Sequence, residues 1–175
     1  MIEAALIARW SLLVVTALML QVGIAPEFPV LGVVANLLLL VAVAGGVVGG
    51  AERGAIVGFF CGLLMDLARG SGALGLSALA YTLVAAAVGA TMTQVLQMRR
   101  LPTMGIVAGG SALGNLLFAV EGQLFGERTL ANPRLWTIVV VSALVNGALS
   151  PLVLRVAAWA ERRPEEPKVL GAVDV

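Results

Sequence analysis

Residues 46–66 read GVVGGAERGAIVGFFCGLLMD, and this stretch decides the fold. One apolar run ends in it at the charged pair Glu52-Arg53, and a second apolar run extends from Gly54 to Met65. Charged side chains are costly inside a bilayer, so the pair predicts a polar boundary between two membrane helices. We therefore interpret the whole chain as apolar spans separated by short charged breaks.

The composition supports an integral membrane protein. The chain has 175 residues, of which 60% are hydrophobic and 12% charged, whereas a soluble domain carries about 25% charged residues. A soluble enzyme, a DNA-binding module and a disordered protein are therefore excluded. The chain has no histidine, and its single cysteine is Cys61. These counts exclude histidine-based catalysis and an internal disulfide. The net charge of +1 is too small to imply a polyanionic partner.

The charge-free stretches predict an all-α membrane protein, a six-transmembrane-helix bundle, because about 20 apolar residues cross a ~30 Å hydrocarbon core. The third span is about 24 Å long at ~1.5 Å per residue, so a re-entrant segment is an alternative to the short crossing that we expect. The first span looks like a retained helix and not a cleaved signal peptide. We expect one domain over 1–160, a charged and disordered cytoplasmic tail over 161–175, and spans at approximately 10–26, 30–51, 54–69, 73–98, 101–120 and 135–158.

Basic residues predict the orientation of this bundle. Six crossings place both termini on one side, and cytoplasmic segments are enriched in Lys and Arg. If that side is the cytoplasm, the outer loops hold Arg69, Arg128 and Arg134, and the inner segments hold the eight residues Arg9, Arg53, Arg99, Arg100, Arg155, Arg162, Arg163 and Lys168. The sequence thus predicts a multi-pass protein with both termini in the cytoplasm.

A glycine series is the clearest internal pattern. It consists of Gly46, Gly50, Gly54, Gly58 and Gly62, each four residues apart. Four-residue spacing keeps neighbours on one face of a helix, and small residues there let a second backbone approach closely. Packing within the bundle and a partner-binding face are both compatible with the pattern.

Asp66 continues the glycine face, four residues after Gly62. A carboxylate in a membrane helix is a functional candidate by default. One interpretation is an interfacial ion pair with Arg69. The other is a structural lock or partner contact, in which Asp66 accepts hydrogen bonds from backbone amides of the turn Gly70-Ser71-Gly72.

Two further groups of polar residues are candidate sites. Asn36 and Asn115 lie in predicted spans, and Ser142, Asn146 and Ser150 share one face of the last span. Such groups bond across helices or line a polar ligand cavity. The loop 121–134 is either a solvated connector or a docking surface, and its candidate contact residues are Glu121, Phe125, Arg128 and Arg134.

Two motifs carry a resemblance to a known family. Residues 54–67 read GAIVGFFCGLLMDL, and residues 75–83, which include Gly75 and Tyr81, read GLSALAYTL. They resemble the patterns Gly-Phe-x-x-Gly-Leu-x-x-Asp and Leu-Gly-x-x-Ala-Leu-x-Tyr of MreD, the rod shape-determining membrane protein of bacteria. The detailed match covers about thirty residues in the middle of the chain, and elsewhere the likeness is one of hydropathy.

The resemblance implies a non-enzymatic part of the elongation machinery that directs peptidoglycan synthesis in the bacterial inner membrane. Its implied partners are an MreC-like bitopic protein, the MreB filament, and RodA-type and penicillin-binding synthases, with no cofactor. MreD proteins are also similar in fold to the substrate-binding subunits of energy-coupling-factor vitamin transporters, which makes such a subunit the alternative. The low aromatic content, 5%, favours the scaffold. A membrane-embedded enzyme needs clustered ionisable residues, and Asp66 is alone.

Overall fold

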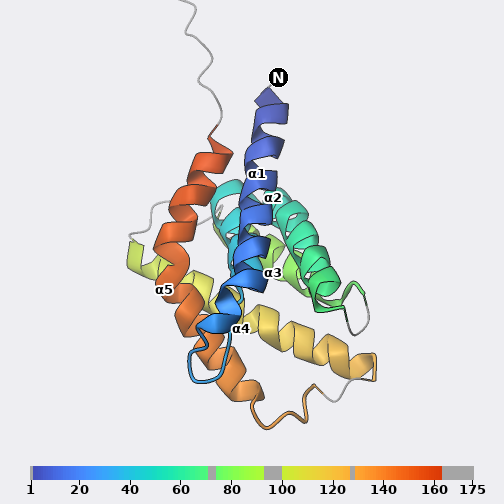
Figure 1. The fold of residues 1–175 in the computed structure, drawn as a ribbon. Helices are drawn as coiled ribbons and strands as arrows, with labels where there is room; N and C mark the ends of the chain where they lie inside the picture. The colour runs from blue at the N-terminus through green and yellow to red at the C-terminus, as the bar shows by residue number, and fades with distance from the viewer. Residues whose placement is uncertain (1, 71–73, 93–99, 127–128, 163–175) are drawn as a thin grey trace, which may run out of the picture.

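A computed structural model describes residues 2–70, 74–92, 100–126 and 129–162. The described part is all-helical, as predicted, with a single isolated bridge between Val30 and Val33 instead of a sheet. Figure 1 shows the elements, which are α1 (Ile2–Gly23), η1 (Ala25–Glu27), α2 (Leu37–Arg69), α3 (Leu76–Met92), α4 (Arg100–Leu124) and α5 (Leu135–Glu161).

Four of the helices are long and apolar enough to cross a membrane. These spans are Glu3–Glu27, Leu37–Arg69, Thr103–Leu124 and Leu135–Glu161, and α3 is a shorter apolar helix. The length and composition of the helices therefore agree with the multi-pass membrane protein that the sequence predicts.

The predicted count of six helices is not confirmed, since the described residues form five α-helices. The second and third predicted spans both fall in α2, and the interruption lies at Gly50 (φ 77°, ψ −172°) instead of at Glu52-Arg53. This backbone conformation is essentially restricted to glycine. The charged pair Glu52-Arg53 does not interrupt the helix, because charged side chains leave the backbone hydrogen bonds intact. The non-helical φ angle of Gly50 does interrupt them.

The chain folds back at Gly50, so that the two parts of α2 lie side by side. A Cβ atom on Gly54 would lie 2.8 Å from the Cα of Gly46, and one on Gly45 would lie 3.1 Å from the Cβ of Val57. In a straight helix, positions eight residues apart are separated by about 12 Å. We call residues 37–49 the inner arm and residues 51–69 the outer arm. The outer arm occupies the place of the third predicted span.

Several helix ends also differ from the prediction. Residues 30–36 form a turn instead of the start of a span, because Leu31 and Gly32 have positive φ angles. Helix α1 begins ahead of residue 10, α4 continues to Leu124, and α5 continues to Glu161. Charged residues were used as span limits, but a helix continues through a charged residue near the membrane border. Residues 93–98 of the fourth predicted span, and the tail from 163 onward, lie outside the described residues.

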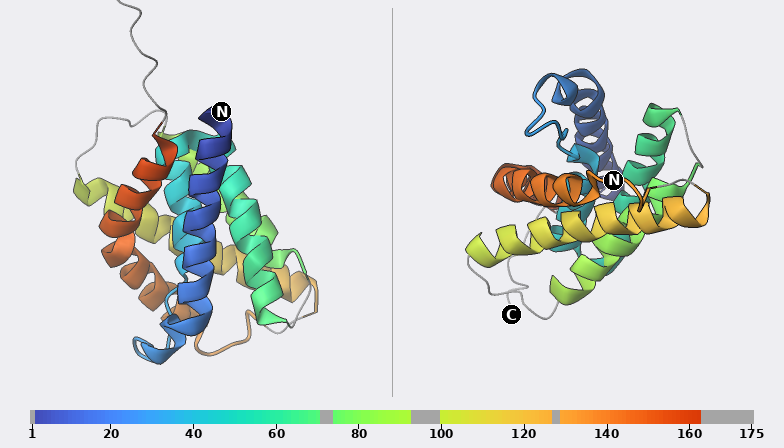
Figure 2. Two further views of the ribbon diagram at one scale, coloured as in Figure 1. Left: turned by 45° about the horizontal axis from the view of Figure 1, so that its top comes forward. Right: turned by 90° about the horizontal axis from the view of Figure 1, so that it is seen from below.

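The inner arm forms the centre of the molecule. Its residues from Leu38 to Ala44 are all buried, with exposed fractions of 0–2%. A helix that is apolar on every side is expected to be surrounded by protein. Figure 2 shows α1, α3, α4 and α5 arranged around it.

The helices define two ends of the bundle. The start of α1, the fold-back of α2 and the end of α5 meet at one end, where Arg9 donates to the carbonyl of Arg162 at 2.9 Å and Arg53 pairs with Glu161 at 3.2 Å. We call this the terminal end. The loop end is opposite (Figure 1) and contains residues 24–36, 74–75, 124–126 and 129–134.

Candidate functional site

The glycine face of the outer arm packs against the backbone of α3. A Cβ atom on Gly58 would lie 2.6 Å from the carbonyl oxygen of Tyr81. Cβ atoms on Gly54 and Gly62 would overlap the carbonyl oxygens of Ala85 and Ser77. Because any side chain there would push two backbones apart, glycine is required for this packing.

Helix α3 contributes a matching row of residues, of which the sequence analysis had named Tyr81 alone as a candidate for helix packing. Each step of four along the outer arm corresponds to a step of four back along α3, through Ser77, Tyr81, Ala85 and Gly89. Gly89 meets the backbone of Gly50 at the fold-back. Three of these four residues are small, and their four-residue spacing was the signal in the sequence. The glycine face is covered by α3 and is therefore an intramolecular interface.

Asp66 lies where this helix pair ends, and it is buried with an exposed fraction of 6%. Its carboxylate accepts hydrogen bonds from the backbone amides of Gly75 at 2.9 Å, Ser77 at 3.1 Å and Ala78 at 3.4 Å. The first amides of a helix have no partner within the helix, and a negative charge there is favourable for the helix dipole. Asp66 thus caps α3 from a neighbouring helix.

These contacts differ in detail from both interpretations of the sequence. The amides belong to Gly75, Ser77 and Ala78 instead of the turn Gly70-Ser71-Gly72, and residues 71–73 lie outside the described residues. Arg69 does not serve as the partner. Its Nη1 donates to the hydroxyl of Ser77 at 3.1 Å, and its guanidinium lies 4.5 Å from the ring centroid of Phe118. Asp66 is a lock between α2 and α3, and Arg69 ties the same end to α4.

A buried polar cluster joins the helices around the inner arm. Asn36 caps the inner arm by accepting from the amide of Leu39 at 3.1 Å, and its Nδ2 donates to the Tyr81 hydroxyl at 2.7 Å. The Nδ2 of Asn146 donates to the carbonyl of Asn36 and to the Ser111 hydroxyl, both at 3.1 Å. The cluster therefore links α2, α3, α4 and α5 with polar side chains, as expected for amides inside a membrane bundle.

The other predicted polar residues extend this cluster or act locally. Asn115 donates to the Ser142 hydroxyl at 3.1 Å, which joins α4 to α5. The Ser150 hydroxyl bonds the carbonyl of Gly147 in its own helix. Among the described residues, the Oδ1 atom of Asn146 is buried without a hydrogen-bond partner. The described polar groups bond mainly to one another, so they are structural contacts across the bundle.

The predicted docking residues of the 121–134 loop do not form one surface. Glu121 lies inside α4 and is buried, with 8% exposure, because the helix continues to Leu124. Phe125 is exposed, and Arg134 is exposed where α5 begins. Arg128 lies outside the described residues. Glu121 is therefore removed from the docking surface, whereas Phe125 and Arg134 remain accessible.

The turn before α2 contains a residue that the sequence analysis missed. Val30 and Val33 exchange two backbone hydrogen bonds of 2.9 Å. Between them Leu31 and Gly32 have φ angles of 51° and 75°, the signs that a type I′ turn requires. Leucine is unfavourable at positive φ, and the side chain of Leu31 is 80% exposed. Such strain clusters at functional sites.

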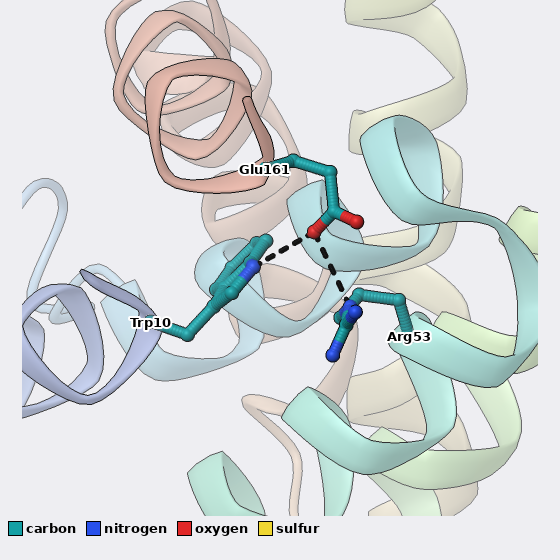
Figure 3. A network of polar contacts seen from close by, with 3 residues as sticks. All are labelled: Trp10, Arg53 and Glu161. Carbon is teal, nitrogen blue, oxygen red and sulfur yellow. Dashed lines mark hydrogen bonds and ion pairs between the residues drawn. The ribbon is translucent and has the colours of Figure 1, made fainter. Parts of the chain in front are cut away.

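The terminal end is closed by three side chains from distant parts of the chain (Figure 3). The indole of Trp10 donates to Oε2 of Glu161 at 2.8 Å, and the Nε of Arg53 lies 3.2 Å from the same oxygen. Glu161 was assigned to the disordered tail, but it is the last residue of α5. No sequence pattern relates these residues, because each lies on a different helix.

No group of three or more metal-ligating side chains occurs among the described residues. The comparison with protein families finds a match to the rod shape-determining protein MreD over residues 4–156. The chain belongs to the MreD family. The match covers most of the chain and extends well beyond the two motifs that suggested it.

Membership of the MreD family identifies a rod shape-determining membrane protein. The family consists of shape-determining proteins and not of enzymes. No curated protein and no solved structure matches the chain. The expected similarity in fold to energy-coupling-factor subunits is therefore not confirmed, and the alternative of a transporter subunit has no support.

Proposed function

We propose that this MreD-family protein is a non-enzymatic membrane scaffold of the rod elongation complex. It binds an MreC-like bitopic protein and thereby helps to direct peptidoglycan synthesis. MreB filaments and the RodA-type and penicillin-binding synthases are the further partners of the same complex. The membership of the MreD family supports the shape-determining role.

The charge distribution favours an orientation with the terminal end in the cytoplasm of a bacterium. Arg9, Arg53 and Arg162 gather at that end, which is typical of the cytoplasmic side. A reporter fused after Val175 should be active only in the cytoplasm. Periplasmic activity of the reporter would contradict this orientation. Labelling of the variant Arg134→Cys from the cytoplasmic side would contradict it as well.

The loop end is the docking surface that we assign to the MreC-like partner. It exposes large apolar side chains outside the membrane helices or at their very ends, with exposed fractions of 67–80%, in Phe28, Leu31, Leu74, Phe125 and Trp136. Aromatic and apolar residues that are accessible at the centre of a surface are typical interface residues. The single observation that carries this assignment is the strained and exposed Leu31.

The Asp66 lock explains how this surface keeps its shape. It joins the end of the outer arm to the start of α3, and Arg69 joins the same region to α4 through Phe118. A surface whose supporting elements are held in advance loses less entropy when a partner binds. The predicted role of Asp66 is therefore to maintain the loop end.

The variant Leu31→Asn tests whether the loop end binds the partner, because it removes an exposed apolar side chain without a cost to folding. Asn-Gly is the preferred pair in a type I′ turn, so this change relieves backbone strain while it removes the apolar side chain. We expect equal or higher thermal stability in detergent and a loss of several-fold in the MreC-like protein recovered from native membranes by affinity purification. Glu27→Asn, at an exposed polar position of the same loop, should retain the partner. Recovery of the partner by Leu31→Asn at the wild-type yield would show that the loop end is not its docking surface.

A further inference from the structure

An apolar groove separates α1 from the outer arm of α2. Its volume is about 520 Å³, and its walls include Ser11, Val14 and Val15 of α1 and Val57, Phe60 and Leu64 of the outer arm. A second hollow, of about 450 Å³, also borders Leu64 and continues toward the loop end between apolar side chains. The two hollows share Leu64 and together follow α1 from the terminal end toward the loop end.

The dimensions of the groove match a lipid chain. From Arg53 to Leu64 the outer arm rises about 16 Å at ~1.5 Å per residue, close to the ~15 Å of one leaflet of the hydrocarbon core. The lining side chains are almost all apolar, as the hydrocarbon of an extended acyl chain requires.

Arg53 closes the groove at the terminal end. Its Nε lies 3.2 Å from Oε2 of Glu161, and the same carboxylate accepts the hydrogen bond from Trp10 (Figure 3). Arginine has five N–H donors in a planar fork. In the described part of the chain, the ion pair with Glu161 uses Nε and leaves both Nη groups of Arg53 without a side-chain partner. These donors lie at one end of the apolar groove.

Three arginines lie at this end of the bundle. They are Arg9, Arg53 and Arg162, and the acidic residues Glu3, Glu52 and Glu161 lie at the same end. Basic pockets between membrane helices on the cytoplasmic side bind anionic headgroups, and the arginine fork matches the geometry of a phosphate. The guanidinium of Arg53 and the apolar wall below it thus complement the two parts of one anionic lipid.

We propose that the groove binds a phospholipid with a negatively charged headgroup. One acyl chain lies between α1 and the outer arm, and the phosphate accepts hydrogen bonds from the free donors of Arg53. The lipid fills the space between α1 and the rest of the bundle, and its headgroup lies beside the Trp10–Glu161–Arg53 contact. This proposal concerns the terminal half of the membrane region and is independent of docking at the loop end.

The test measures lipid retained by the purified full chain after reconstitution in nanodiscs that contain equal amounts of phosphatidylglycerol and phosphatidylcholine. Native mass spectrometry after release into detergent should show one bound phosphatidylglycerol in preference to phosphatidylcholine. Ser11→Phe fills the groove and should reduce the retained lipid at least tenfold. Thr16→Phe is the matched control, because Thr16 is an exposed hydroxyl residue of the same helix that does not line the groove.

A second pair of variants tests the headgroup. Arg53→Gln should abolish the preference for phosphatidylglycerol, whereas Arg134→Gln, an equal loss of charge at the loop end, should leave it unchanged. Because Arg53→Gln also removes the ion pair with Glu161, Ser11→Phe provides a test that does not touch this pair. Equal lipid retention by Ser11→Phe, Thr16→Phe and the wild type would overturn the proposal.

Discussion

The substitution Asp66→Asn measures how much the lock between α2 and α3 contributes to folding. The side chain keeps its shape but loses its charge, and one oxygen that faces backbone amides becomes an NH₂ group. Gly75 and Ser77 donate to the carboxylate at 2.9 and 3.1 Å, and Ala78 donates at the longer distance of 3.4 Å. The two shorter bonds change from charged to neutral, at a cost of about 1 kcal/mol each.

The loss of the interaction with the dipole of α3 adds about 0.5–1 kcal/mol. The total is a destabilisation of about 2–3 kcal/mol, which corresponds to a decrease in Tm of about 5–10 °C for a chain of this size. Thermal unfolding in detergent, followed by circular dichroism, gives this decrease directly. We also expect less MreC-like protein to be recovered, because the loop end loses its support.

Arg69→Gln is the matched control at the same end. Arg69 is exposed and makes one hydrogen bond and one cation–π contact, so its loss should cost only about 1 kcal/mol. If Asp66→Asn unfolds within 1 °C of the wild type and retains the partner at the wild-type yield, Asp66 is not a lock, and the argument from its three amides fails.

Three further predictions concern the fold-back, the glycine face and the buried polar cluster. Gly50→Ala should destabilise the protein by about 1–3 kcal/mol because its φ of 77° is restricted to glycine; Gly105→Ala, inside α4 where a Cβ meets nothing within 4 Å, is the control in the same thermal assay and should leave the stability unchanged or raise it by up to about 1 kcal/mol. Gly58→Leu should separate the outer arm from α3 and lower the yield of folded monomer in gel filtration, whereas Ile56→Leu at an exposed position should not; equal profiles would contradict close packing. Asn146→Leu should cost about 1 kcal/mol through lost contacts between helices, and a wild-type Tm would show that its two bonds contribute nothing.

The most local features of the site were accessible from the sequence. Gly58, Gly62 and Asp66 share one helical face because their spacing is four residues, and spacing is a property of the chain alone. Which face they pack against was not accessible. Nothing in the sequence distinguishes Ser77 and Ala85 from other small residues. Their role follows from the antiparallel packing of α3 on the outer arm, which places their carbonyl oxygens against the glycines.

The sequence by itself determined a membrane-embedded helical protein. The length of the apolar stretches and the scarcity of charge are properties of the chain alone and do not depend on how its helices pack. Only the tertiary structure decided where α2 reverses and which charges are buried. Gly50 reverses the chain through its φ angle. Hydropathy carries no information about φ, and it therefore predicts the break at the charged pair Glu52-Arg53 instead. Glu161 joins Trp10 and Arg53 across more than a hundred residues of sequence, and such pairs exist only once separate helices have packed together.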